Sequence, residues 1–134
     1  MNAIRFIPTG IHAYFDYIGG VGLIAAPFVF GFFSVGGAAV IVPMVLGVGL
    51  ILYSLMTNYE LGLPDLKFIP MAYHLIFDFV ACVFLILSPF LFGFINQAPN
   101  AWLPHIVAGA GVILLVLVTQ TRYQPKMKTA AASK

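Results

Sequence analysis

The chain has very few charged residues. Of its 134 residues only six are Lys or Arg and four are Asp or Glu, a charged share of 7% where soluble domains have roughly 25%. This scarcity excludes an ordinary water-soluble globule, and a net charge of +2 is too small to indicate a nucleic-acid partner. The single cysteine, Cys82, excludes an internal disulfide. Cys82 lies in an apolar run, where we expect it to pack as a small hydrophobic residue.

Apolar residues take the place of the missing charges. They make up 62% of the chain, and the mean hydropathy is +1.06. A bilayer core about 30 Å thick requires roughly 20 apolar residues for each helix that crosses it. Four segments meet this requirement, at about 10–33, 37–58, 71–95 and 101–121. The sequence therefore predicts an all-α membrane protein with four transmembrane helices and the lipid bilayer as its surroundings.

The two halves of the sequence repeat each other. A shift of 62 residues superimposes them without a gap, so that "RFIP" falls on "KFIP" and "PFVFGF" on "PFLFGF". Each half contains two spans, so the halves run in the same sense. The prediction is a single membrane domain of two parallel-repeated helical hairpins, related by a pseudo-twofold axis along the membrane normal. Repeat 1 covers about 6–60, repeat 2 covers about 68–122, and a flexible basic tail follows at 123–134.

The basic residues indicate the orientation. All six lie on the side that carries both termini and the polar connector "TNYELGLPDLKF" between the halves, whereas the other two loops are uncharged. The positive-inside rule therefore places both termini in the cytoplasm. Aromatic residues near the ends of the spans, among them Tyr59 and Trp102, are expected to form belts at the membrane interfaces.

The stretch "ILSPFLFGF" (86–94) and its echo "IAAPFVFGF" (24–32) resemble the signature of the SPW-repeat family, a two-helix unit with Ser-Pro-Trp followed by Gly-Phe. "NAWLPHIVAGAGVILLVL" (100–117) is similar to the second helix of that unit. The chain has Phe28 and Phe90 where the family has tryptophan, and Ala26 where it has serine. The resemblance implies a small integral protein of the bacterial cytoplasmic (inner) membrane and carries over no catalytic residue.

A histidine and an aspartate stand four residues apart at the start of the first and third spans. The pairs are His12 with Asp16 and His74 with Asp78. Residues four apart lie on one face of a helix, and ionisable groups in a span avoid lipid. We therefore expect both pairs to face the bundle axis and to converge into one cluster near the cytoplasmic side.

Three interpretations of this cluster remain open. The pairs act as structural fasteners that tie the two halves together, they hold and pass protons, or they ligate a divalent metal or a haem between His12 and His74. The fastener interpretation predicts no cofactor. His105 has no counterpart in the first half and is expected to lie at the membrane interface.

Prolines and glycines also recur at equivalent positions. Pro27 and Pro89 lie inside the first and third spans, where each removes a backbone donor and is expected to kink the helix before it ends. Ser88 can donate to the carbonyl of Leu85 that Pro89 leaves free. Small residues in the second and fourth spans are expected to permit close helix packing. These residues are Gly47, Gly49, Gly109 and Gly111.

The sequence contains no phosphate-binding glycine loop, no nucleophile elbow and no His-Glu-x-x-His motif. Very little of it lies outside the predicted spans, so we expect a protein that is not an enzyme. The favoured function is a structural or accessory membrane protein that packs against itself as a homo-oligomer or against a larger membrane complex. The alternative is a minimal protein that handles protons, ions or a metal through the two His-x-x-x-Asp pairs.

Overall fold

The computed structural model describes residues 4–125, which form four α-helices: α1 (Thr9–Val29), α2 (Gly37–Leu55), α3 (Met71–Leu91) and α4 (Pro99–Val118). Short 3-10 turns connect them, at Phe33–Val35, Pro64–Leu66 and Phe94–Asn96. The predicted all-α class is confirmed for these residues. The predicted basic tail, 123–134, lies outside the described residues from residue 126 onward.

The helices end three or four residues before the predicted span ends. In α1 and α3 the cause is a glycine, because Gly31 and Gly93 have φ values of +72° and +75°, a left-handed conformation that stops a helix. In α2 and α4 the chain becomes extended at Thr57 and Thr119, where each residue forms an isolated parallel β-bridge. Hydropathy alone could not show either stop, since the apolar character continues past it.

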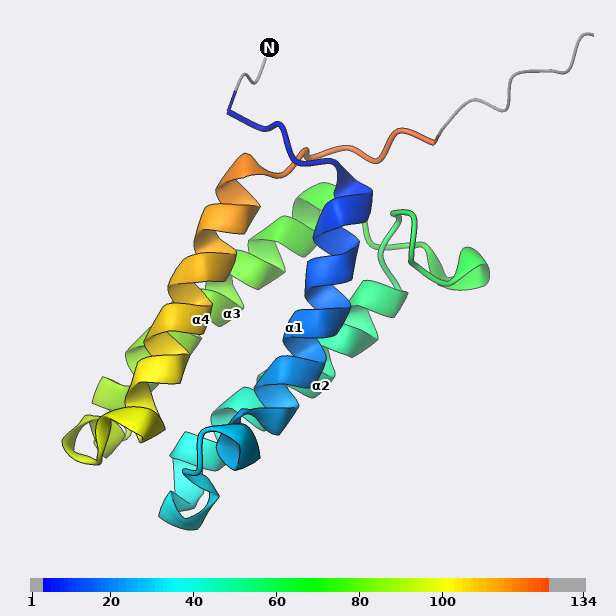
Figure 1. Ribbon diagram of the computed structural model, residues 1–134. Helices are drawn as coiled ribbons and strands as arrows, with labels where there is room; N and C mark the ends of the chain where they lie inside the picture. The colour runs from blue at the N-terminus through cyan, green and yellow to red at the C-terminus, as the bar shows by residue number, and fades with distance from the viewer. Residues whose placement is uncertain (1–3, 126–134) are drawn as a thin grey trace, which may run out of the picture.

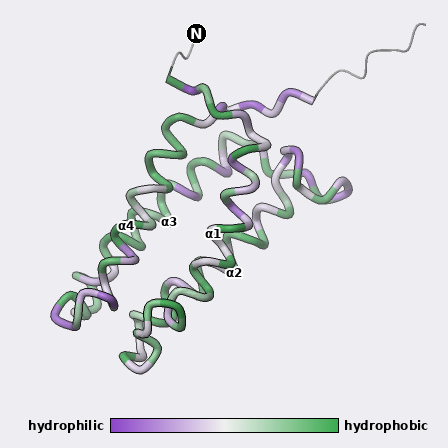
Figure 2. Tube along the Cα trace, viewed as in Figure 1, coloured by the Kyte–Doolittle hydropathy of each residue, from purple (hydrophilic) through white to green (hydrophobic). Residues whose placement is uncertain are grey.

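Three of the four helices in the described part of the chain are long and apolar enough to cross a membrane, namely α2, α3 and α4. The remaining helix, α1, is as long as α3, with 21 residues. Each of the two carries one histidine and one aspartate, but α1 also contains four glycines and two tyrosines, which lower its hydropathy. Figure 2 shows hydrophobic residues along the helices and hydrophilic ones mainly in the connector, near the chain ends and in the loop between α3 and α4. Only three clear spans are therefore found where four were predicted.

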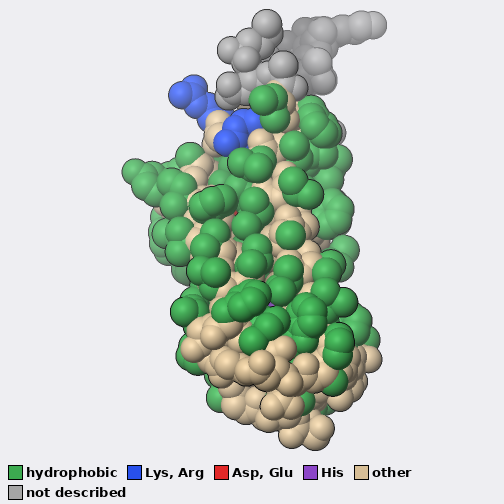
Figure 3. All heavy atoms as spheres, turned by 90° about the vertical axis from the view of Figure 1, so that its left-hand side faces the viewer, with side chains coloured by type: hydrophobic (Ala, Val, Ile, Leu, Met, Phe, Trp, Pro, Cys, Tyr) green, Lys and Arg blue, Asp and Glu red, His purple; other side chains and the backbone are tan. Residues whose placement is uncertain are grey.

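The helices form two hairpins, α1 with α2 and α3 with α4, that lie beside each other (Figure 1). Both described chain ends and the connector between the hairpins lie at one end of the molecule. The loops inside each hairpin lie at the other end. We call these the connector end and the loop end. On the face shown in Figure 3, hydrophobic side chains cover the middle, and Lys and Arg appear only at the connector end.

Each hairpin is joined to the other through equivalent backbone contacts at the connector end. Ile7 donates to Val118 O at 2.9 Å, and its repeat equivalent Ile69 donates to Met56 O at 3.0 Å. The start of each half thus pairs with the end of the other half. At the loop end, Asn100 Nδ2 donates to Phe30 O at 2.9 Å and joins the second hairpin to the first. The hairpins are held together at both ends.

Two of the four predicted packing glycines lie at close helix contacts. A Cβ added to Gly47 would lie 2.6 Å from Gly20 O, and one added to Gly109 would lie 2.9 Å from Cys82 O. The prediction is wrong for Gly49 and Gly111, since a Cβ at either would meet open space. Residues two apart in a helix point about 200° away from each other, so one glycine of each pair must face away from the contact.

The recurrent prolines lie in the last turn of their helices. Pro27 is two residues before the end of α1, and Pro89 is two residues before the end of α3. Ser88 Oγ donates to Leu85 O at 2.7 Å, the carbonyl that Pro89 deprives of its usual donor. A kink at either proline stays a prediction.

Candidate functional site

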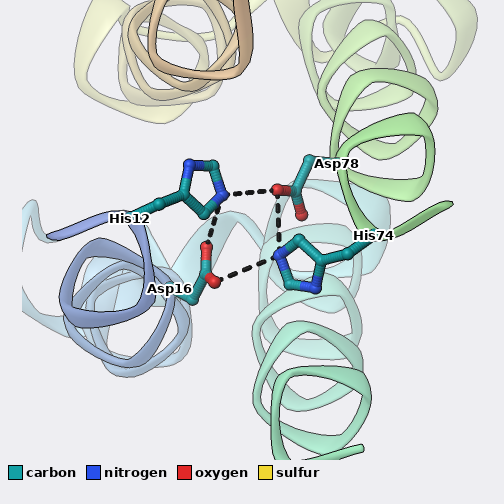
Figure 4. A group of neighbouring side chains, drawn as sticks. All are labelled: His12, Asp16, His74 and Asp78. Atoms are coloured by element: carbon teal, nitrogen blue, oxygen red, sulfur yellow. Dashed lines mark hydrogen bonds and ion pairs between the residues drawn. The ribbon is translucent and has the colours of Figure 1, made fainter. Parts of the chain in front are cut away.

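The structure brings His12 and Asp16 of α1 together with His74 and Asp78 of α3 (Figure 4). The first and third helices each begin after a proline, Pro8 or Pro70, so each histidine lies in the first turn and each aspartate one turn later. All four side chains are buried, with exposed fractions of 0–3%. One nitrogen or oxygen from each residue lies within 4.8 Å of those of the other three.

The four side chains alternate around a ring. His12 Nε2 lies 3.2 Å from Asp16 Oδ1 and 3.0 Å from Asp78 Oδ2. His74 Nε2 lies 3.1 Å from Asp16 Oδ2 and 3.2 Å from Asp78 Oδ2. Each carboxylate is therefore near both imidazoles and each imidazole near both carboxylates. The two imidazole rings meet edge to face, with centroids 5.5 Å apart.

Two threonines determine which nitrogen of each imidazole carries hydrogen. Thr119 Oγ1 donates its only hydrogen to Leu115 O at 2.6 Å, so it can only accept from His12 Nδ1, 2.8 Å away. Thr57 Oγ1 donates to Tyr53 O at 2.7 Å and accepts from His74 Nδ1 at 2.8 Å. Both imidazoles are therefore Nδ1–H donors. Each histidine contacts the threonine of the other half, so the arrangement needs both halves.

Two tyrosines hold the carboxylates. Tyr59 Oη donates to Asp16 Oδ2 at 2.9 Å, and Tyr53 Oη donates to Asp78 Oδ1. Tyr59 lies in the connector and is fully buried. Its burial, with Asp16 beside it, raises the pKa of Tyr59, so its hydroxyl stays a donor at neutral pH. Each carboxylate is left with one oxygen free of tyrosine contacts, and that oxygen points toward a histidine.

The Nε2 atoms face the carboxylates. On a neutral Nδ1–H imidazole, Nε2 carries a lone pair, and a lone pair against a carboxylate oxygen is repulsive unless a cation lies between them. His12 Nε2 lies at hydrogen-bond distance from Asp78 Oδ2, 3.0 Å away, whereas the buried His74 Nε2 makes no hydrogen bond of normal geometry with any described residue. Burial of so many polar groups is costly unless their charges are compensated. The cluster therefore needs two protons or a metal ion.

Sequence reasoning missed the threonines and tyrosines. Thr57 and Thr119 superimpose in the repeat, which was a usable signal. Tyr53 and Tyr59 correspond to Leu115 and Thr121, so the repeat could not reveal them. The expectation of an interfacial position is wrong for Tyr59, which is buried in the cluster.

His105 also departs from the prediction. It is only 2% exposed, so its side chain packs inside the bundle and does not extend toward headgroups or water. Its Nε2 lies 3.1 Å from Ala39 O of α2, and its ring contacts Phe32 and Phe94. His105 therefore joins the two hairpins near the loop end, far along α4 from the cluster.

The model of the SPW repeat domain matches residues 10–119 of the chain. The chain belongs to the SPW repeat family. The matched region begins two residues before His12 and ends at Thr119, so it contains the four clustered residues and both threonines. No curated protein and no solved structure shows significant similarity to this SPW repeat protein. Membership of this family, together with the three helices that are long and apolar enough to cross a bilayer, shows that it is a membrane protein.

Proposed function

We propose that this SPW repeat protein crosses the bacterial cytoplasmic membrane four times and binds one divalent first-row metal ion at His12, Asp16, His74 and Asp78. The observation that carries the proposal is the orientation of the two histidines. Both Nδ1 atoms donate to threonines, so Nε2 is the atom of each ring that faces the two carboxylates. Metal-bound histidines in proteins are held in the same way, by a hydrogen bond from the other ring nitrogen.

The distances fit a metal ion. The four distances around the ring are 3.0–3.2 Å, and the two that involve Asp16 use different oxygens, Oδ1 toward His12 and Oδ2 toward His74. One ligand atom from each residue lies within 4.8 Å of those of the other three. A square with a diagonal of that length has its centre about 2.4 Å from each corner, slightly more than the zinc–nitrogen and zinc–oxygen distances of about 2.0–2.2 Å. Two imidazoles with two carboxylates suit Zn²⁺, Fe²⁺ or Mn²⁺.

The charges also balance. A divalent cation neutralises the two carboxylates, which is what burial in a membrane requires. A single ion is favoured over the haem alternative because both carboxylates lie between the two imidazoles, whose rings are 5.5 Å apart. There is no space for a flat macrocycle between them.

The position of α1 as a fourth span is part of this proposal. It is supported by the equal lengths of α1 and α3 and by the burial of the ionisable residues of α1, His12 and Asp16, inside the cluster. Orientation with both termini in the cytoplasm is supported by the basic residues at the connector end. Arg5 and Lys67 lie there, donating to Thr119 O at 2.7 Å and to Tyr59 O at 2.7 Å.

The favoured test is metal content with a matched pair of variants. Wild-type protein purified in detergent and exposed to Zn²⁺, Fe²⁺ or Mn²⁺ is expected to retain one equivalent of one of these metals after desalting. Asp78→Asn is expected to lose it, whereas Asp65→Asn, at an exposed aspartate of the connector, is expected to keep it. Metal added to the chelated wild type should raise its Tm, since a ligand that binds only the folded state stabilises it.

The same experiment can reject the proposal. Wild-type protein that retains no metal and shows no change of Tm with any of the three ions would identify the cluster as an ion-pair ring. Its role would then be the structural one, to fasten the two hairpins together. The rise of Tm does not depend on whether Asp78→Asn folds.

A further inference from the structure

A large apolar cavity separates the two hairpins. Its volume is about 920 Å³, and all four helices contribute to its walls. Apolar side chains and glycines make up nearly all of the lining. The polar exceptions lie at its two ends: Asp16, Tyr53 and Asp78 at the cluster, and His105 near the loop end. The volume is near the upper limit of ordinary ligand pockets, about 300–1,000 Å³.

The cavity opens sideways between α1 and α4. These two helices make few contacts with each other, whereas α2 packs more closely along α3. Ile18 of α1 and Val107 of α4 line the cavity and are also 69% and 62% exposed, so they form its rim. Both helices lie at the front in Figure 1. In a protein that spans the bilayer, this opening faces the lipid and not the water.

The cavity is long. Its lining runs from Phe15 in α1 to Phe30, the residue that follows the helix, and at 1.5 Å per residue this corresponds to about 22 Å. That length is most of the thickness of a bilayer core, about 30 Å. A long apolar space with a side opening to lipid fits a hydrocarbon chain better than a compact, water-soluble molecule.

The polar residues at the cluster end of the cavity limit which polar head group a bound lipid can have. Within residues 4–125, no Lys or Arg lines the cavity, so nothing there compensates a phosphate. Carboxylates accept hydrogen bonds and do not donate them, and the Tyr53 hydroxyl already donates to Asp78. A matching head group is therefore small, uncharged and a hydrogen-bond donor.

We propose that this cavity binds a neutral lipid from the bilayer, with one long hydrocarbon chain between the hairpins and a hydroxyl head group beside Asp16 and Asp78. The proposal rests on the four-span arrangement of the proposed function. It does not require the metal ion, because the cavity is formed by the hairpins themselves.

A pair of glycines provides a matched test. Gly111 lines the cavity, and a Cβ added there meets open space. Its repeat equivalent Gly49 also has open space around it but does not line the cavity. Leucine at position 111 therefore enters the cavity, and leucine at position 49 points elsewhere. Gly22, on the opposite wall in α1, also lines the cavity and has open space.

The experiment uses hexadecanol with a photoreactive diazirine in mid-chain, added to the full chain in phosphatidylcholine nanodiscs. Labelled peptides are expected from the cavity faces of α1 and α4, and unlabelled hexadecanol should compete. A side chain that occupies part of the cavity lowers the affinity for hexadecanol about tenfold. Gly111→Leu and Gly22→Leu should therefore reduce labelling by that factor. Gly49→Leu should label like wild type. Metal content and Tm, measured on the same samples, show whether each variant is folded and whether the metal site is intact.

Three results would overturn the proposal. Labelling spread evenly over the outward faces of all helices would indicate ordinary surrounding lipid. Equal labelling of Gly111→Leu and Gly49→Leu would mean that the cavity is not the site. Cross-links between two copies across α1 and α4, with no labelling by hexadecanol, would assign the opening to a dimer interface. A labelled protein without metal would leave this proposal standing and reject the proposed metal site alone.

Discussion

The two halves of this SPW repeat protein agree in the histidines, aspartates and threonines of the cluster and differ in its tyrosines. His12 and His74 each donate through Nδ1 to a threonine of the other half, at the same distance of 2.8 Å. The tyrosines that hold both aspartates, Tyr53 and Tyr59, come from the first half alone. The comparison teaches that the repeat supplies the four residues proposed as metal ligands, whereas residues unique to the first half donate hydrogen bonds to the carboxylates.

The seams between the hairpins differ in the same way. The seam between α2 and α3 is packed, and its equivalent between α4 and α1 opens into the cavity. Gly22 on the open seam corresponds to Phe84 in the second half, and Phe84 does not line the cavity. One symmetric centre is thus combined with one asymmetric opening, as expected if a single ligand approaches from one side.

The strongest test of the symmetry uses the threonines. Thr57→Val and Thr119→Val each remove the acceptor that fixes Nδ1 of one histidine. Loss of such a partner typically lowers metal affinity by about 10–100-fold, and the two variants are expected to be equally affected. Competition of the purified variants with a chromogenic chelator measures this. Loss of affinity in one variant alone would show that the histidines are not equivalent.

The tyrosines test the asymmetry. Tyr59→Phe removes the only tyrosine that donates to Asp16 within residues 4–125 and leaves a buried carboxylate oxygen without this hydrogen bond. A hydrogen bond to a charged group contributes about 1.5–3 kcal/mol, so we expect a loss of that size in the free energy of unfolding. The matched control is Tyr17→Phe, whose half-buried hydroxyl donates to Leu61 O and should cost about 0.5–1.5 kcal/mol. Denaturation curves that give the same loss of unfolding free energy for Tyr59→Phe and Tyr17→Phe would show that Tyr59 does not stabilise the Asp16 carboxylate.

The glycines give the smallest expected effects. Gly47→Ala and Gly109→Ala each place a methyl group against a backbone carbonyl, at 2.6 and 2.9 Å, and overpacking of this kind costs about 1–3 kcal/mol. Gly49→Ala and Gly111→Ala have open space and should stabilise their helices by about 0.5–1 kcal/mol. Thermal unfolding in detergent measures all four. A destabilised Gly111→Ala would contradict the open cavity wall.

Much of the fold could be predicted because it follows from composition and repetition. The apolar runs predicted the four helices to within a few residues, and the repeat predicted that His12, Asp16, His74 and Asp78 lie on equivalent faces. The helix ends could not be predicted, since they depend on positive φ at Gly31 and on the β-bridge at Thr57. Neither feature changes the hydropathy of the sequence at that point.

The rest of the site depends on contacts that no period in the sequence encodes. Tyr59 reaches Asp16 from the connector, whose two ends are joined by the hydrogen bond from Asn58 N to Ile69 O at 2.8 Å. His105 reaches Ala39 across the hairpins and has no counterpart to indicate it. Periodicity shows which face of a helix a residue occupies, but tertiary packing decides what that face meets.

The central claim is that Nε2 of both histidines is a metal ligand and carries no hydrogen. Nitrogen-15 NMR of the histidine side chains in the detergent-solubilised, metal-loaded protein tests it most directly. The predicted result for His12 and His74 is a hydrogen on Nδ1 and none on Nε2, with a chemical shift of Nε2 that changes when the metal is removed. Hydrogen on both nitrogens of each ring, unaffected by chelator, would contradict the claim and establish an ion-pair ring.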